Sequence, residues 1–134
     1  MTRSIFFAVL VITALAVTAC EGGAQSPTAA LESVPAEFAG KTNPLGADAA
    51  TEGANIFKTN CEACHGPHGH GDGPAGAALN PRPKNLAELQ NAVGDDYLFW
   101  RVSTGKEGTS MVAWKGVLTD EQIWQVIAFI NTLK

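Results

Sequence analysis

The chain has 134 residues, which is enough for one domain of ordinary size with flanking segments. Its 9 lysine and arginine residues are outnumbered by 13 aspartate and glutamate residues, so the formal net charge is −4. This mildly acidic balance argues against a nucleic-acid partner and against a cationic helix that would bind a membrane surface.

The N-terminal residues have the layout of a secretion signal. Arg3 precedes an apolar run over residues 5–17, and small residues follow it. A helix of that length would reach about 20 Å, whereas the hydrocarbon core of a membrane is roughly 30 Å thick. A permanent transmembrane helix is therefore the weaker interpretation, and we expect residues 1–19 to be a signal peptide that directs export to the periplasm.

The apolar signal is followed by a short segment that ends in a cysteine, Cys20. The segment Val17-Thr18-Ala19-Cys20 resembles the lipobox of bacterial lipoproteins, in which the signal is cut before a cysteine that carries acyl chains. On this resemblance Cys20 is lipidated and anchors the protein at the outer face of the cytoplasmic membrane or at another periplasmic leaflet. The alternative is ordinary cleavage after Ala16, which would leave Cys20 as a free thiol.

The next segment, residues 20–45, is rich in Gly, Ala, Ser, Thr and Pro and has no sustained helical period. We expect it to be a flexible tether with a root-mean-square span of roughly 25–30 Å. The domain proper is then expected to occupy residues 46–134.

Helix signals begin just after the tether. Asp48 can cap a helix that runs to about Asn60, because apolar residues recur there at i, i+3 and i+4 spacing. Gly53 is costly inside a helix, so we expect its backbone to lie close to another element. A shorter helix is expected after Asn85. No period-two pattern indicates a strand, and the expected fold class is all-α.

Two further helices are expected in the C-terminal third. One begins at Asp95 or Asp96 and stops at Gly105, a residue suited to a left-handed cap. The last should run from residue 120 nearly to residue 133, after a capping box formed by Thr119 and Gln122. This last helix carries too many apolar side chains for one amphipathic face, so it should be largely buried.

The residues Cys61-Glu62-Ala63-Cys64-His65 form the attachment sequence of c-type haem. Cysteines at i and i+3 lie on one side of a helical turn, as bonding to two vinyl groups of one haem requires, and His65 follows where its imidazole can reach the iron. Two alternatives are a redox disulfide between Cys61 and Cys64, and a zinc site completed by His68 and His70. The glycine- and proline-rich residues 66–83 should form an irregular loop that is ordered by packing.

From these residues the segment 46–134 resembles class I cytochromes c, which are small electron carriers with one haem. The resemblance implies a class I cytochrome c fold, in which the terminal helices pack across each other near Gly53 around one covalent haem c. The matching pieces are Gly53 and Phe57, Cys61 to His65, the Gly-Thr-Ser-Met stretch that ends at Met111, and Trp124, Ala128 and Phe129 in the last helix.

The second axial ligand of the iron has three candidates. His68 is too close to His65 in sequence, since three residues span at most about 10 Å and cannot pass around a porphyrin. His70 is marginal on the same argument. Met111 is the one methionine beyond the first residue, and it lies in a loop between two expected helices. The family often has proline after this methionine, where this chain has Val112.

Other contacts of the haem are implied less directly. In the family a proline carbonyl near a Gly-Pro pair accepts a hydrogen bond from the ligating histidine, which points to Pro74, with Pro81 and Pro83 as alternatives. Three further side chains could contact the haem propionates or could equally be core and surface residues: Trp100, Arg101 and Trp114.

We expect a lipid-anchored one-electron carrier of a respiratory or photosynthetic chain, which is not an enzyme. Its partners would be a redox protein that donates electrons and another that accepts them. The alternative is a fixed subunit of a membrane oxidoreductase complex, of the alternative complex III or terminal oxidase type. A gas-binding haem sensor is a third hypothesis, and it would require an open or labile axial position.

Overall fold

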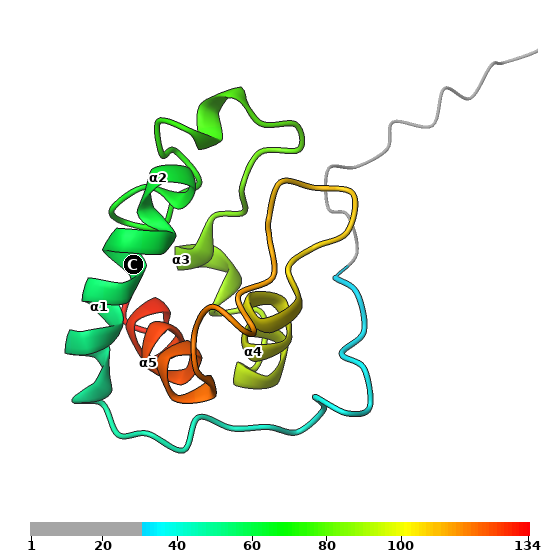
Figure 1. The fold of residues 1–134 in the computed structure, drawn as a ribbon, viewed down its shortest axis with the longest axis vertical. Coiled ribbons are helices and arrows are strands. Elements are labelled where there is room, and N and C mark those ends of the chain that lie inside the picture. The colour runs from blue at the N-terminus through cyan, green and yellow to red at the C-terminus, as the bar shows by residue number, and fades with distance from the viewer. Residues whose placement is uncertain (1–30) are drawn as a thin grey trace, which may run out of the picture. The chain divides into compact units, whose positions relative to one another are not determined.

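The computed structural model describes residues 31–134, which are coloured in Figure 1. The expected signal peptide, the lipidation site Cys20 and the first part of the tether lie outside the described residues. In the described part the regular elements are helices without a β-strand, and an isolated bridge joins Lys115 and Leu118. None of these helices is long and apolar enough to cross a membrane. The all-α expectation is confirmed.

The helices lie close to their expected positions. They are α1 (Ala49–Asn60), α2 (Glu62–His65), α3 (Leu86–Leu89), α4 (Asp95–Thr104) and α5 (Asp120–Ile130), with a 3-10 turn η1 (Gly76–Ala78) between α2 and α3. Helix α5 ends earlier than expected, and hydrogen-bonded turns carry the chain on to Leu133. Asp48 directly precedes α1, but its side chain does not make the capping hydrogen bond that the sequence suggested.

Local capping chemistry accounts for several of these boundaries. The Thr119 hydroxyl accepts a hydrogen bond from the Gln122 N–H at 3.1 Å, and the Gln122 side chain accepts one from the Thr119 N–H at 2.9 Å. This is the expected capping box of α5. Helix α4 stops at Gly105, whose φ of +70° lies in the left-handed region that favours glycine.

Helix α1 packs directly against α5, as Figure 1 shows. A methyl group added at Gly53 would lie 1.9 Å from the carbonyl oxygen of Gln125 and 3.1 Å from Cβ of Phe129. One turn later, the rings of Phe57 and Phe129 pack with their centroids 5.0 Å apart. The expected close backbone contact at Gly53 is therefore confirmed.

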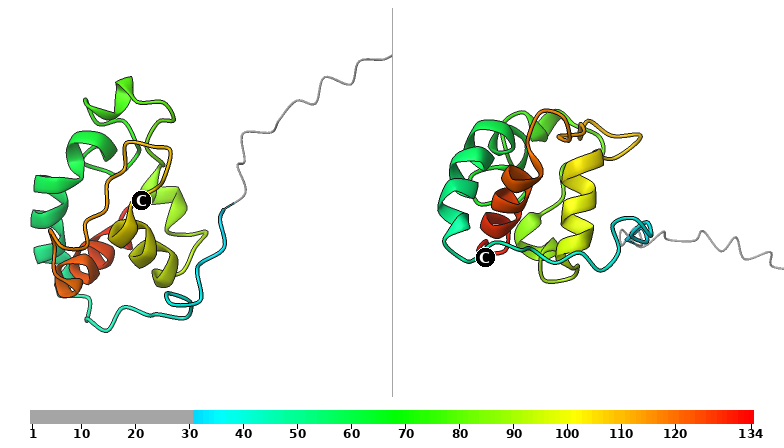
Figure 2. Two further views of the ribbon diagram at one scale, coloured as in Figure 1. Left: turned by 45° about the vertical axis from the view of Figure 1, so that its right-hand side comes forward. Right: turned by 60° about the horizontal axis from the view of Figure 1, so that its bottom comes forward.

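The core forms where four helices meet. Helix α5 contacts both α1 and α4 and lies between them in the views of Figure 2. Its side chains Ile123, Val126 and Ile127 have no exposed surface, which agrees with the expected burial. The same cluster includes residues of the other three helices: Ile56 and Phe57 of α1, Leu86 and Ala87 of α3, and Leu98, Phe99 and Val102 of α4.

Residues 32–45, which we call the strap, differ from the expected flexible tether. Phe38 packs against the core cluster. The Asn43 N–H donates to the Asp95 carboxylate at 2.9 Å, and the Asn43 side chain donates to the Trp124 carbonyl at 2.8 Å. The packed unit thus begins at residue 32 rather than at residue 46.

The strap begins with an ion-pair network centred on Glu32. One carboxylate oxygen accepts a hydrogen bond from Nη2 of Arg101 at 2.5 Å, and the other pairs with Nζ of Lys106. The hydrogen bond from Lys106, followed by that from Arg101, lowers the pKa of Glu32 from 4.5 to about 2. Glu32 therefore stays ionised at any pH where the protein is expected to work.

The contact at Gly53 leads to a stability prediction. Gly53→Ala should lower the free energy of unfolding by about 1–3 kcal/mol, because the methyl group would push α1 away from the α5 backbone. The measurement is the denaturant midpoint of the haem-loaded protein. Gly46→Ala is the control, since nothing lies within 4 Å of its added methyl group. Equal midpoints for the two variants would contradict the tight crossing.

The lowered pKa of Glu32 leads to a second prediction, for Glu32→Gln. Because the folded-state pKa lies below the unfolded value, the stabilisation by Glu32 is present above pH 4.5 and is lost as the pH falls toward 2. The melting temperature of the variant should thus lie below that of the wild type at pH 7, and the difference should close between pH 4.5 and 2. Glu37→Gln, which breaks no ion pair in the described residues, should leave the melting temperature at pH 7 unchanged. A difference that stays constant down to pH 2 would contradict the ion-pair network.

Candidate haem site

The attachment residues form a single helical turn at the end of α1. The Cys61 N–H donates to the Phe57 carbonyl at 2.8 Å, which joins the turn to α1. The N–H groups of Cys64 and His65 then both donate to the Cys61 carbonyl, at 3.1 and 2.9 Å. The spacing expected from the sequence is therefore realised, since the two thiols are one helical turn apart with the imidazole directly after them.

The glycine-rich loop after this turn is ordered by packing against it. The Ala75 N–H donates to the Ala63 carbonyl at 2.8 Å. A methyl group at Gly76 would lie 2.2 Å from the Cys64 carbonyl oxygen, and one at Gly73 would lie 2.5 Å from that of Ala63. Because only residues without a side chain permit this approach, the loop glycines brace the backbone of α2.

The imidazole of His65 is held by a backbone carbonyl. Its Nδ1 lies 3.2 Å from the Lys84 carbonyl oxygen, and since that oxygen can only accept, Nδ1–H is the donor. Burial lowers the pKa of His65, and this outweighs the opposite effect of the Lys84 hydrogen bond. The lowered pKa favours the neutral ring, in which the lone pair of Nε2 is available to a metal.

This contact corrects one expectation. The acceptor is the carbonyl of Lys84 and not that of Pro74. Lys84 directly follows Pro83, one of the two alternatives, so the expected region was near but the residue was wrong. A contact of Pro74 with the haem itself stays a prediction. A backbone acceptor can be any residue, and for this reason no side chain in the sequence could have marked Lys84.

The two cysteines are half-buried free thiols. Burial, with a smaller effect of nearby Cys64, raises the pKa of Cys61 to about 12. A thiol protonated to this degree is a poor redox nucleophile. Residues 31–134 contain no group of three or more His, Cys, Asp and Glu side chains placed to hold a metal ion.

The other two histidines lie on the exposed part of the loop. The rings of His68 and His70 are 5.9 Å apart, and both residues are exposed. Nε2 of His70 lies 3.3 Å from the carbonyl oxygen of Lys134. His68 and His70 are therefore surface residues of this loop.

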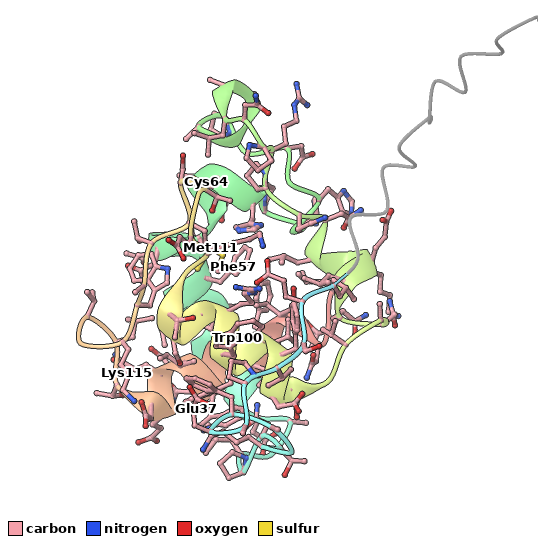
Figure 3. All side chains as sticks on the ribbon, turned by 90° about the vertical axis from the view of Figure 1, so that its right-hand side faces the viewer. Glu37, Phe57, Cys64, Trp100, Met111 and Lys115 are labelled. Atoms are coloured by element: carbon pink, nitrogen blue, oxygen red, sulfur yellow. The ribbon has the colours of Figure 1, made fainter. Side chains whose placement is uncertain are left out.

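Met111 lies in a hydrogen-bonded loop after α4 and is half-buried. Its carbonyl accepts from the Lys106 N–H at 3.0 Å, and its N–H donates to the Thr109 hydroxyl at 3.1 Å. A methyl group at Gly105 would lie 2.5 Å from the Met111 carbonyl oxygen, so the loop folds tightly onto the end of α4. Figure 3 places Met111 and Cys64 toward the same end of the view, on different elements.

The residues present fit a covalently bound c-type haem. Two thiols occupy one turn, an imidazole with a free Nε2 follows them, and a thioether comes from a separate loop. These are the donors that a haem with His and Met ligation uses.

The three candidate propionate residues have distinct environments. The Arg101 guanidinium lies 3.7 Å from the centroid of the Trp100 ring and is paired with Glu32. Its Nε is buried without a hydrogen-bond partner in the described residues, as is the hydroxyl of Ser103. Trp114 is half-buried beside the core cluster. A role of these residues at the propionates stays a prediction.

Comparison with known proteins agrees with this site. A family profile described as "Cytochrome C oxidase, cbb3-type, subunit III" matches residues 48–130, and the chain belongs to this family of c-type cytochromes. It is a class I cytochrome c with one covalently bound haem c, and its role is electron transfer rather than enzymatic catalysis.

Individual relatives support the same class. Cytochrome c6 of Thermosynechococcus vestitus is 37% identical over 86 residues, which cover 64% of this chain and 70% of that protein. Cytochrome c6 of Synechococcus elongatus is 37% identical over 78 residues, covering 58% of this chain and 83% of that protein. The cbb3-type cytochrome c oxidase subunit FixPc of Rhizobium leguminosarum is 33% identical over 97 residues, which are 70% of this chain but 31% of that protein.

One solved structure shares the fold. A chain of the reducing HAO-like protein complex of Kuenenia stuttgartiensis has a TM-score of 0.56 and 24% sequence identity, over 65% of this chain. The matched region spans less than half of that longer chain, at 45%. At this identity the likeness shows the fold alone.

Proposed function

We propose that this protein is a one-electron carrier of a respiratory or photosynthetic chain, exported to the periplasm and held at the membrane by a lipid on Cys20. Cys61 and Cys64 would attach the haem, and His65 and Met111 would ligate its iron. The observation that carries the assignment is the His65–Lys84 hydrogen bond, because it leaves Nε2 free directly beside two thiols on one turn. Pro74 remains a candidate contact of the haem.

Each residue has a distinct task in this proposal. The bound haem supplies an Fe(III)/Fe(II) couple. The Lys84 carbonyl fixes the ring orientation of His65 and makes the imidazole a better electron donor. The neutral thioether of Met111 would favour the reduced iron and so raise the reduction potential. The braced turn and loop keep these donors in place while the charge on the iron changes.

The membrane attachment rests on the N-terminal sequence. The lipobox-like residues 17–20 would supply an acylation site. A lipid at Cys20 would therefore explain how the carrier stays near membrane-bound partners.

A fixed subunit of a membrane oxidoreductase complex is the second candidate. Two observations favour it, namely the description of the family profile and the similarity to a cbb3-type oxidase subunit. Co-purification after mild detergent extraction separates the two: a fixed subunit elutes with its complex, whereas a carrier elutes alone. An alternative complex III or a terminal oxidase would be the complex to look for.

Met111→Ala tests the ligand assignment and the gas-sensor hypothesis together. The variant should keep its covalent haem, because the attachment residues are untouched, yet lose the ferric sulfur-to-iron charge-transfer band and bind CO readily when reduced. Its reduction potential should fall, since the thioether that favours Fe(II) is gone. Val112→Ala is the matched control and should change none of these properties.

Two results would contradict the assignment of Met111. An intact charge-transfer band in the variant would show that another group ligates the iron. Rapid CO binding by the reduced wild type, equal to that of the variant, would favour a sensor with an open axial position.

Cys20→Ser tests the lipid anchor. The variant should appear in the soluble periplasmic fraction with its haem attached, because stable anchoring requires the acyl chains that only the cysteine can carry. The measurements are fractionation after a salt wash and the intact mass of both proteins. Ser26→Ala, a change in the same segment, should remain in the membrane fraction. An unmodified mass of wild-type Cys20 would rule the lipid out.

A further inference from the structure

The loop that carries Met111 is built as a closed ring of backbone contacts. The Lys106 N–H donates to the Met111 carbonyl at 3.0 Å, which brings the two ends of the loop together. Inside the ring the Thr109 hydroxyl donates to the Lys106 carbonyl at 2.8 Å and accepts from the Met111 N–H at 3.1 Å. Any displacement of Lys106 is therefore passed directly to the backbone of Met111.

This ring meets helix α4 at a glycine. Helix α4 ends at Thr104, and Gly105 turns the chain with a φ of +70°. Gly105 is the joint between α4 and the loop, and a methyl group added there would lie 2.5 Å from the Met111 carbonyl oxygen, so the loop packs closely against it. Backbone hydrogen bonds from Trp114 to Val102 and from Lys115 to Ser103 hold the far end of the segment, beyond Met111. The near end, at Lys106, bonds to Met111 and Thr109 within the loop and has a further restraint from outside it.

The carboxylate of Glu32 supplies that restraint. One of its oxygens pairs with Lys106 at the start of the Met111 loop, and the other pairs with Arg101 on α4. The carboxylate therefore connects the two sides of Gly105. Arg101 is a fixed point, because its side chain is only 10% exposed and its guanidinium is stacked on the ring of Trp100. Glu32 makes both salt bridges found in residues 31–134.

Glu32 is itself held by the packed strap. The Gly40 N–H donates to the Asp96 carboxylate at 2.9 Å, and Phe38 lies against the core with its ring centroid 6.3 Å from that of Phe99. The carboxylate is thus delivered by a segment with its own contacts to α4. The entropy cost that weakens most surface ion pairs is smaller when both partners are already placed.

We propose that Glu32 is a positioning residue that keeps the Met111 loop closed and so holds the methionine sulfur on the iron. This inference rests on the proposed role of Met111 as axial ligand. It gives the strap a share in the control of the haem, because the segment that bonds to α4 and α5 also restrains the loop of Met111.

The test measures how often Met111 leaves the iron. Imidazole binds the ferric haem only after the methionine is displaced, so the limiting rate of imidazole binding at high concentration reports loop opening. In the full-length, haem-loaded protein, Glu32→Gln should raise this rate about 2- to 5-fold, the range expected for loss of a well-placed exposed ion pair. Glu37→Gln removes the same charge from the strap without breaking an ion pair in the described residues, and should leave the rate unchanged.

Two further variants separate positioning from general stability. Lys106→Gln should raise the rate like Glu32→Gln, and the double variant should be no faster than the faster single variant, because both changes break one connection. Glu32→Asp keeps the charge, so its limiting rate of imidazole binding should lie between those of the wild type and Glu32→Gln. The difference between Glu32→Gln and wild type should shrink as ionic strength rises from 0.01 to 1 M, since the Debye length falls from about 30 to about 3 Å.

The outcomes distinguish this inference from the proposed function. If the wild type shows the sulfur-to-iron band and Glu32→Gln lowers the melting temperature without changing the imidazole rate, Glu32 is merely structural and the inference is wrong. If Glu32→Gln and Lys106→Gln act additively, the bridge does not exist. If the wild type lacks the band, the role of Met111 fails and the inference fails with it.

Discussion

Helices α1 and α5 approach so closely at Gly53 that no side chain fits between them, and the position of the haem turn depends on this contact. The Gln125 carbonyl occupies the space that any other residue would need at position 53. Because the Cys61 N–H continues the hydrogen-bond ladder of α1, the place of that helix on α5 also sets the place of the two thiols. The core beneath it is made of apolar side chains from α1, α3, α4 and α5.

A second constraint acts on the far side of the turn. The glycine-rich loop lies against the backbone of α2 and then returns along the chain to present the Lys84 carbonyl to His65. The turn is therefore clamped between a helix crossing and a loop, both of which rely on glycine for close approach. Such a rigid support suits a cofactor that must change its charge with little movement of its ligands.

The features that could be predicted from the sequence are those whose interacting residues lie close together along the chain. The capping box at Thr119, the glycine stop at Gly105 and the attachment motif each depend on residues a few positions apart, so their patterns are visible in the sequence. The crossing at Gly53 was also predictable, because a glycine inside a helix requires a reason. The resemblance to a known family supplied Met111, whose environment cannot be inferred from periodicity.

The parts that escaped prediction depend on contacts between distant residues. The strap has the composition of a flexible tether, and its order comes from partners on α4 and α5 more than 50 positions away, such as Asp95. Phe38, the one aromatic residue of the segment, was the only local signal of packing. The pairing of Glu32 with Arg101 likewise has no local signature, since a lone acidic residue is usually a solvated one.

The use of a backbone carbonyl at His65 has a consequence for how this site tolerates change. Since every amino acid carries the same carbonyl group, the identity of residue 84 is nearly free, and what must be conserved is the path that brings this peptide group to the imidazole. An insertion or deletion between residues 65 and 84 would present a different peptide group, or none. Related proteins should therefore differ in the amino acids between residues 65 and 84 but keep the same number of residues there.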